Sequence, residues 1–337
     1  MNPLSTQDIN DRQNDASHLR LLQAADVEHA KAQRVESTRW IIALAISGAG
    51  LAAMVFPSAR VVATIAGVFA AVLTELVWPR LAKNLNTRAV LIQEQFDTSL
   101  FDIGWNSDLG RKIPLVHVND AANQYKKTVS KKDWYLNVRG IPSPVAETLC
   151  QRENLIWDAD QREEWARKLA IGLGAWLVLG LGISFAGQLY VWQLCTWYIA
   201  PTLPAATLAL RSVIQQRTVA RTKIELREQI DEALLGLSPD MTAPHKFESL
   251  KTELRSRQDK IFRTRLDSSR IPERFYNRLR ARYEANHHVD AEHFRSVWAV
   301  DADSEGTTGL PSASQQDGTD PTTPNYSGSR SSRDDKQ

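Results

Sequence analysis

The densest set of side chains able to bind anions lies between Gln258 and Tyr283. Guanidinium groups bind phosphates through paired hydrogen bonds, and aromatic rings stack on nucleobases. The same residue types also suit an anionic inner leaflet of a membrane or a helix face held by ion pairs, so three interpretations stay open. The arginines of this segment and the aromatic residues between them are Arg263, Arg265, Arg270, Arg274, Arg278, Arg280 and Arg282, with Phe262, Phe275, Tyr276 and Tyr283.

Motifs for enzymatic chemistry are sparse. The sequence contains no P-loop, no G-x-S-x-G and no H-E-x-x-H motif. The carboxylates Asp97, Asp102 and Asp158 are the candidates for an active site in the central part of the chain. Asp158 and Asp160 form an acidic pair that favours a helix cap over a metal site. We therefore predict no catalytic residue, no metal site and no cofactor.

The charge balance excludes another class of function. The 337 residues include 41 Lys and Arg against 39 Asp and Glu, a formal net charge of +2. A protein that coats DNA or RNA usually has a strong basic excess, so no nucleic-acid polymer is expected as a partner. The apolar residues are concentrated in two blocks, which argues against a single well-mixed globular domain.

The two apolar blocks extend over 40–78 and 169–210, about 40 residues each. A helix needs about 20 apolar residues to cross the hydrocarbon of a bilayer, so each block can form two crossings joined by a short turn. Helices buried in a soluble core usually carry a polar stripe, which these segments lack. The sequence thus predicts an all-α integral membrane protein with two transmembrane helical hairpins. The four predicted spans are residues 40–57, 60–78, 168–187 and 189–210.

The loops predict the orientation of these hairpins. Their tips contain one basic residue, Arg60, whereas the other Lys and Arg residues flank the apolar blocks. The positive-inside rule then places both termini and the central segment in the cytosol. Rows of small residues, such as Ala63, Gly67 and Ala71 or Gly180 and Ser184, favour close packing of the helices.

The remaining segments are predicted to be helical and cytosolic. A helix from Ser17 to Arg39 is expected to run into the first crossing, after a polar stretch (1–15) that is expected to be loose. From Leu85 to Ile103 apolar residues recur every three or four positions, which predicts a helix that continues the second crossing and is bent or capped near Pro79. The predicted parts are an N-terminal helix (1–39), hairpin 1 (40–78), a central helical segment (79–167), hairpin 2 (168–210), C-terminal helices (211–298) and a disordered tail (299–337).

Glu75 is the one acidic residue within a predicted span. Ionisable groups inside a membrane are costly and often functional. A pore-lining or gating role is one interpretation. The other is that the side chain reaches the interface, because Glu75 lies less than one turn from Trp78.

Several short motifs occur in a characteristic order around the two hairpins, and together they resemble the SMODS-associated four-transmembrane effector family of bacteria. The likeness extends over about residues 10–295, with Gly104 at a position where the family pattern would have proline. The motifs are Leu19-Arg-Leu-Leu-Gln-Ala-Ala-Asp26, Ile92-Gln-Glu-Gln-Phe-Asp97, Phe101-Asp-Ile-Gly-Trp-Asn106, Asp133-Trp-Tyr135, Cys150-Gln-Arg-Glu-Asn154, Trp157-Asp158, Arg257-Gln-Asp-Lys-Ile-Phe-Arg-Thr-Arg265 and Ile271-Pro-Glu-Arg-Phe-Tyr276.

The resemblance implies a function in anti-phage signalling (CBASS). A partner nucleotidyltransferase would make a cyclic oligonucleotide, and the effector would sense it and disrupt the bacterial inner membrane. Four helices of one protomer are too few to enclose a wide pore, so a homo-oligomer in the lipid bilayer is implied. Ligand contacts are expected among Trp134, Tyr135, Arg152, Arg265, Tyr276 and Arg278, unless these residues form structural ion pairs with Asp97, Asp102 and Asp158.

Two alternatives differ from a pore in class. The chain could be a membrane-anchored scaffold without channel activity, since the helical seams at 81–103 and 213–237 could recruit a partner protein. It could also be a membrane enzyme with a site in the central segment.

Overall fold

The computed structural model of this protein describes residues 8–126, 130–237, 244–268, 270–272, 275, 292, 294 and 296–298, without the side chains of residues 74, 75, 244 and 247. All regular elements within these residues are helices, which confirms the predicted all-α class. The predicted tail (299–337) lies outside the described residues. So do Tyr276, Arg278, most of the predicted C-terminal helical region after residue 272, and the Glu75 side chain.

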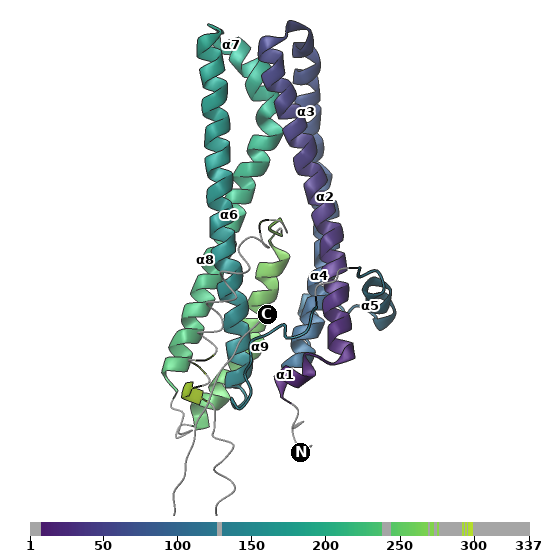
Figure 1. Cartoon of the computed structure of the whole chain (residues 1–337), viewed down its shortest axis with the longest axis vertical. Coiled ribbons are helices and arrows are strands. Elements are labelled where there is room, and N and C mark those ends of the chain that lie inside the picture. Colours follow the sequence, from purple (N-terminus) through teal and green to yellow (C-terminus); the bar gives the residue numbers. More distant parts are fainter. Residues whose placement is uncertain are drawn as a thin grey trace, which may run out of the picture. The chain divides into compact units, whose positions relative to one another are not determined.

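Two unusually long helices organise the fold. α2 (Ala16–Val55) has 40 residues and α6 (Val145–Ala186) has 42. At 1.5 Å per residue each is about 60 Å long, roughly twice the thickness of the bilayer hydrocarbon. Each helix begins among polar residues and ends among apolar ones without a break. α2 lies beside α4 (Trp78–Leu100), and α6 lies beside α8 (Ala200–Leu235) (Figure 1).

The first predicted hairpin is present. α2 ends at Val55, a 3₁₀ turn (Pro57–Ala59) reverses the chain, and α3 (Arg60–Leu76) returns along α2. A one-residue break at Val77 separates α3 from α4, which has Pro79 in its first turn. The helix predicted to continue the second crossing is thus interrupted two residues before Pro79, and proline is tolerated in the first turn of the helix that follows.

The second hairpin is less regular. After α6 ends at Ala186, a one-turn helix, α7 (Val191–Gln193), leads into a π-helical turn (Leu194–Ile199) and then into α8. Within the part of the chain that the structure describes, three helical segments are long and apolar enough to cross a membrane: Ala16–Val55, Pro57–Leu100 and Val145–Ala186. The fourth predicted span, 189–210, is divided among α7, the π turn and the start of α8.

The apolar halves of these helices leave large hydrophobic side chains uncovered. Val61 and Phe69 of α3 are 69% and 67% exposed, and Val178 and Phe185 of α6 are 69% and 89% exposed. Contiguous exposed apolar surface of this kind is unfavourable in water and favourable in hydrocarbon. It indicates a membrane protein.

The two hairpins touch through small residues. A Cβ atom added at Gly67 would lie 2.4 Å from the Cα atom of Pro201 in α8. Within the second hairpin, one added at Gly180 of α6 would lie 2.0 Å from the ring of Tyr198 in the π turn. The predicted close packing at Gly67 and Gly180 is thus found within a single protomer. The Thr64 hydroxyl also donates a hydrogen bond (2.9 Å) to the backbone carbonyl of Thr196, one of the residues in the π turn.

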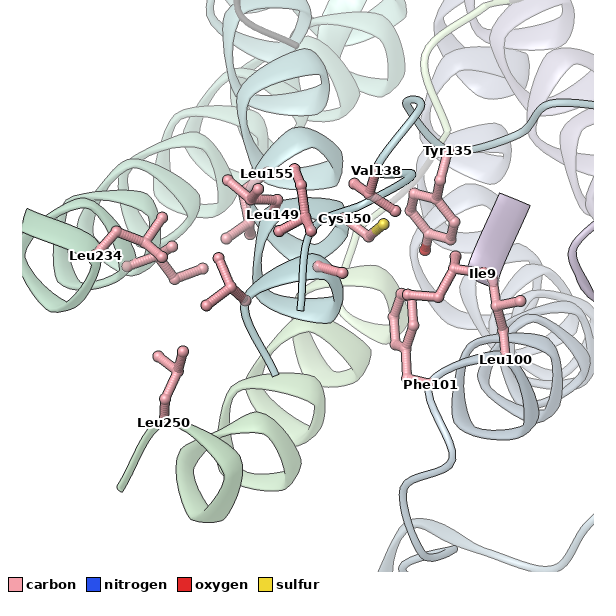
Figure 2. Packing of buried hydrophobic residues seen from close by; sticks show 14 of the residues in the cluster. Ile9, Leu100, Phe101, Tyr135, Val138, Leu149, Cys150, Leu155, Leu234 and Leu250 are labelled. Atoms are coloured by element: carbon pink, nitrogen blue, oxygen red, sulfur yellow. The ribbon is translucent and has the colours of Figure 1, made fainter. Parts of the chain in front are cut away.

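A hydrophobic core lies at the polar ends of the long helices and joins them to α1 (Ile9–Arg12) and α9 (Pro244–Leu266) (Figure 2). Three residues of the predicted seam, Ile92, Phe96 and Leu100, are fully buried, although Ile92 packs in a neighbouring cluster with α5 (Leu115–Ala122). The first residues after position 7 were expected to lack structure, but α1 forms there.

α1 is held by contacts distant in sequence. Asn10 accepts a hydrogen bond from the backbone N–H of Val138 (2.9 Å), and Gln13 accepts one from the backbone N–H of Tyr135 (2.8 Å). These amides belong to the loop that precedes α6. A helix of four residues is unstable alone, so α1 depends on this loop.

Candidate functional site

A buried ion pair between Arg265 of α9 and Asp97 of α4 lies at the centre of the region formed by the polar ends of the long helices. The Asp97 side chain is fully buried, and that of Arg265 is 9% exposed. The Tyr135 hydroxyl donates a hydrogen bond of 2.7 Å to the second oxygen of Asp97. The carboxylate is therefore bound from two separate segments.

Hydrogen bonds extend this pair across three helices. Gln258 of α9 donates to both Glu94 (2.8 Å) and Asp97 (3.1 Å) of α4. Gln151 of α6 donates to the Gln258 side-chain oxygen (3.1 Å), and Arg255 donates to Glu94 (2.7 Å). We name the set the buried polar network. Its members are Glu94, Asp97, Tyr135, Gln151, Arg255, Gln258 and Arg265.

Burial and charge shift the pKa values within this network. Burial, assisted by the neighbouring Asp97, raises the pKa of Glu94 to about 7. Burial, again with Asp97, raises the pKa of Tyr135 well above its ordinary value. Burial is the largest single effect on the pKa of Arg265 and acts to lower it, but the attractions of Asp97, Tyr135 and Glu94 and the hydrogen bond to Asp97 together outweigh burial and raise that pKa. Arg265 thus stays charged, while Glu94 titrates near neutral pH.

A second charged cluster joins α6 to α8. Asp158 accepts hydrogen bonds from Arg162 (2.6 Å) and from Lys223 (2.8 Å), whose side chain is 1% exposed. Burial lowers the pKa of Lys223 to about 8, against the opposing effect of Asp158. Burial also acts to raise the pKa of Asp158, but the two cations outweigh it and lower that pKa. The prediction that Asp158 caps a helix is wrong, because α6 continues through this position.

The expected ligand residues are distributed over these contacts. Tyr135 and Arg265 come together on Asp97, so the anticipated ion pair with Asp97 is formed. Arg152 of α6 instead donates to Asp231 of α8 (2.5 Å) and lies 4.9 Å from the Phe294 ring. The Trp134 ring is half-buried with the Lys131 ammonium 5.4 Å from its centre.

Sequence reasoning did not select the glutamines Gln151 and Gln258 or the arginine Arg255. Each glutamine is almost fully buried and bridges two helices. A polar residue among apolar seam positions would have been the available signal, because such a side chain must find a hydrogen-bond partner when buried.

The three candidate catalytic carboxylates have different surroundings. Asp97 and Asp158 are bound by cations, as described above. Asp102 follows α4 in the left-handed region (φ 51°) and is exposed. Among the described residues, no group of three or more His, Cys, Asp or Glu side chains could hold a metal ion.

Comparison with known proteins assigns the class of this molecule. Long helices with uncovered apolar halves and a buried polar network at the other end define a helical membrane protein. The chain belongs to the SMODS-associating 4TM effector domain family, which matches residues 7–294. It is also 25% identical over 184 residues to a probable CBASS effector molecule of Bacillus cereus (strain VD146). That alignment covers 52% of this chain and 62% of the relative. No solved structure matches the chain.

Proposed function

We propose that this protein is a pore-forming membrane effector that senses a cyclic oligonucleotide through its cytosolic helices and disrupts the bacterial inner membrane during phage infection. Membership of the effector family and the likeness to a probable CBASS effector support this role. A nucleotidyltransferase of the same defence system would supply the ligand.

The continuity of the helices carries the proposal. α2 and α6 each pass unbroken from the polar region into an apolar segment. α4 contributes Glu94 and Asp97 to the buried polar network and adjoins α3 through the break at Val77. A displacement of the network would therefore move the membrane segments directly. A ligand drives such a change only by binding the open state better than the closed one.

The proposed topology has four spans, with both termini in the cytosol. Residues 191–235 are helical through a π turn, so they could form the fourth crossing despite their irregular start. One protomer would contribute four helices to a homo-oligomer in which Glu75 faces the pore. Glu75→Gln should then reduce the preference for cations over anions, measured as a reversal-potential shift in planar bilayers. An unchanged reversal potential would contradict a pore-lining position.

Two of the expected ligand residues, Tyr135 and Arg265, would be accessible to a ligand in an open state but not in the closed state. Tyr135 and Arg265 are 5% and 9% exposed and are fully engaged with Asp97. They could meet a ligand only after the network separates. Initial capture of the ligand then requires a more accessible site.

Membrane potential tests the function. Cells that express this chain with the nucleotidyltransferase should lose membrane potential within minutes of infection, as reported by a voltage-sensitive dye. Cells with either protein alone should keep it. Purified protein in liposomes should likewise release an encapsulated dye only when a cyclic oligonucleotide is added. Ligand binding without dye release or bilayer conductance would favour the scaffold alternative.

A further inference from the structure

A groove of about 390 Å³ lies between α8 and α9 and is open to solvent. α8 supplies acceptors and a small apolar side chain, and α9 supplies two cations, a hydroxyl and a carboxylate. The lining residues are Gln229, Glu232, Ala233, Glu253, Ser256, Arg257 and Lys260.

Arg257 is the unusual member of this groove. Its side chain is 5% exposed and forms an ion pair with Glu253, one turn earlier in α9, through Nη2. Its Nη1 atom is buried and has no hydrogen-bond partner within the described part of the chain. A buried donor without a partner is unfavourable, and more so when the group is charged. Arg257 therefore lines the groove and has a buried donor that no described residue uses.

The neighbouring side chains extend this donor set. Lys260 lies one turn after Arg257, is exposed, and forms no ion pair with any described residue. Ser256 adds an exposed hydroxyl. Guanidinium, ammonium and hydroxyl groups converging on one volume suit a phosphate group, because each donates to its oxygens.

The opposite wall has the reverse character. Glu232 and Gln229 of α8 are exposed and present carboxylate and amide oxygens to the groove. Glu232 forms no ion pair with the described residues. Such oxygens suit the exocyclic amino groups of adenine, guanine or cytosine. A phosphate site facing a site for N–H donors is the pattern expected for a nucleotide.

The volume limits how much of a ligand can enter. Pockets for small molecules range from about 300 to 1,000 Å³, and this groove lies near the lower end of that range. It can hold one nucleotide, whereas the remainder of a cyclic oligonucleotide would stay outside.

We propose that the α8–α9 groove binds one nucleotide unit of a phosphodiester ligand, with Arg257 and Lys260 on the phosphate and Glu232 on the base. The ligand class rests on the proposed function. α9 also carries Arg255 and Gln258, which bind α4. A ligand in the groove therefore acts on the helix that holds the buried polar network together.

Titration of the purified full chain in detergent tests the groove. The probes are 3′,3′-cyclic di-AMP, 3′,3′-cyclic di-GMP and cyclic tri-AMP, with inorganic phosphate as a comparison. Lys260→Glu and Glu232→Ala should each weaken the best cyclic oligonucleotide by about tenfold or more, since each removes a hydrogen bond that involves a charged group. Lys251→Glu is the matched control: Lys251 is exposed on α9 and does not line the groove.

The possible results distinguish the groove proposal from the proposed pore formation. The groove assignment is overturned if no cyclic oligonucleotide binds the wild-type chain, if phosphate alone binds as tightly, or if the groove variants bind like the control. If Lys260→Glu still releases dye when the ligand is added, the groove proposal is refuted and the proposed effector function is supported. If the groove variants lose binding and wild-type protein in liposomes releases no dye, the groove proposal is supported and the pore proposal is refuted.

Discussion

Arg265 and Asp97 are 168 residues apart in sequence, yet their side chains form an ion pair inside the protein. The pair joins α9, near the C-terminal end, to α4, which adjoins a membrane segment. Removal of one partner leaves an uncompensated buried charge, which typically costs about 3–5 kcal/mol.

Asp97→Ala should therefore lower the free energy of unfolding by about that amount, because Arg265 would stay buried and charged. Thermal melting of the full chain in detergent measures the effect. Arg263→Ala serves as a control, since Arg263 is exposed on the same helix. The double variant Asp97→Asn with Arg265→Met should recover part of the loss, and a melting temperature for Asp97→Ala equal to that of the control would refute the buried pair.

The raised pKa of Glu94 predicts a pH dependence. Its pKa is about 7 in the folded protein, against an ordinary value of 4.5. Between these values the folded chain keeps a proton that the unfolded chain releases, so the free energy of unfolding falls as pH rises from about 4.5 to about 7. Glu153, whose burial also raises its pKa to about 7, contributes in the same direction.

Glu94→Gln should remove the share due to Glu94 and flatten the melting temperature between pH 5 and pH 7. Glu228→Gln is the control, because Glu228 is exposed on α8 and lies outside the buried polar network. A Glu94→Gln profile as steep as the wild-type profile would mean that Glu94 is ionised throughout this range.

The contact between the hairpins predicts an effect of one methyl group. Gly67→Ala would place a Cβ atom 2.4 Å from the backbone of Pro201, which cannot move aside without displacing α8. Overpacking of this kind costs about 1–3 kcal/mol. Gly48→Ala is the matched control, with no heavy atom near the added Cβ. Equal melting temperatures for the two variants would show that the hairpins do not touch at Gly67.

The cluster at Asp158 predicts an asymmetry between its members. Asp158→Ala would leave Arg162 and Lys223 close together without their shared anion and should cost about 3–5 kcal/mol. Lys223→Met should cost less, because Arg162 still pairs with Asp158. Melting temperatures of both variants, compared with that of Glu163→Gln at an exposed position of α6, decide the order. A larger loss for Lys223→Met would contradict this arrangement.

The features predicted best from the sequence depend on long patterns. The apolar blocks gave the hairpins, and the seam through Ile92, Phe96 and Leu100 gave the buried face of α4. Both signals repeat over several turns, so tertiary contacts reinforce them. The ion pair of Arg265 with Asp97 agrees with one of the two interpretations given for the candidate ligand residues, namely structural ion pairs with Asp97, Asp102 and Asp158.

The features that were missed depend on partners distant in sequence. Asp158 resembles a cap locally, but its role is set by Lys223 on another helix. α1 has four residues and exists because Asn10 and Gln13 bind a distant loop. The π turn at Leu194–Ile199 has no recognised sequence signal of its own and lies where α8 packs against α2 and α3.

The unbroken length of α2 has a mechanical consequence. In the topology proposed above, α2 is about 60 Å long with half its length in the bilayer, and such a helix would move as one body. When its inner end swings by a few ångströms about a fulcrum at the lipid surface, its outer end swings the opposite way. Small rearrangements around α1 and α4 would thereby be converted into lateral separation of the helix ends on the far side of the bilayer.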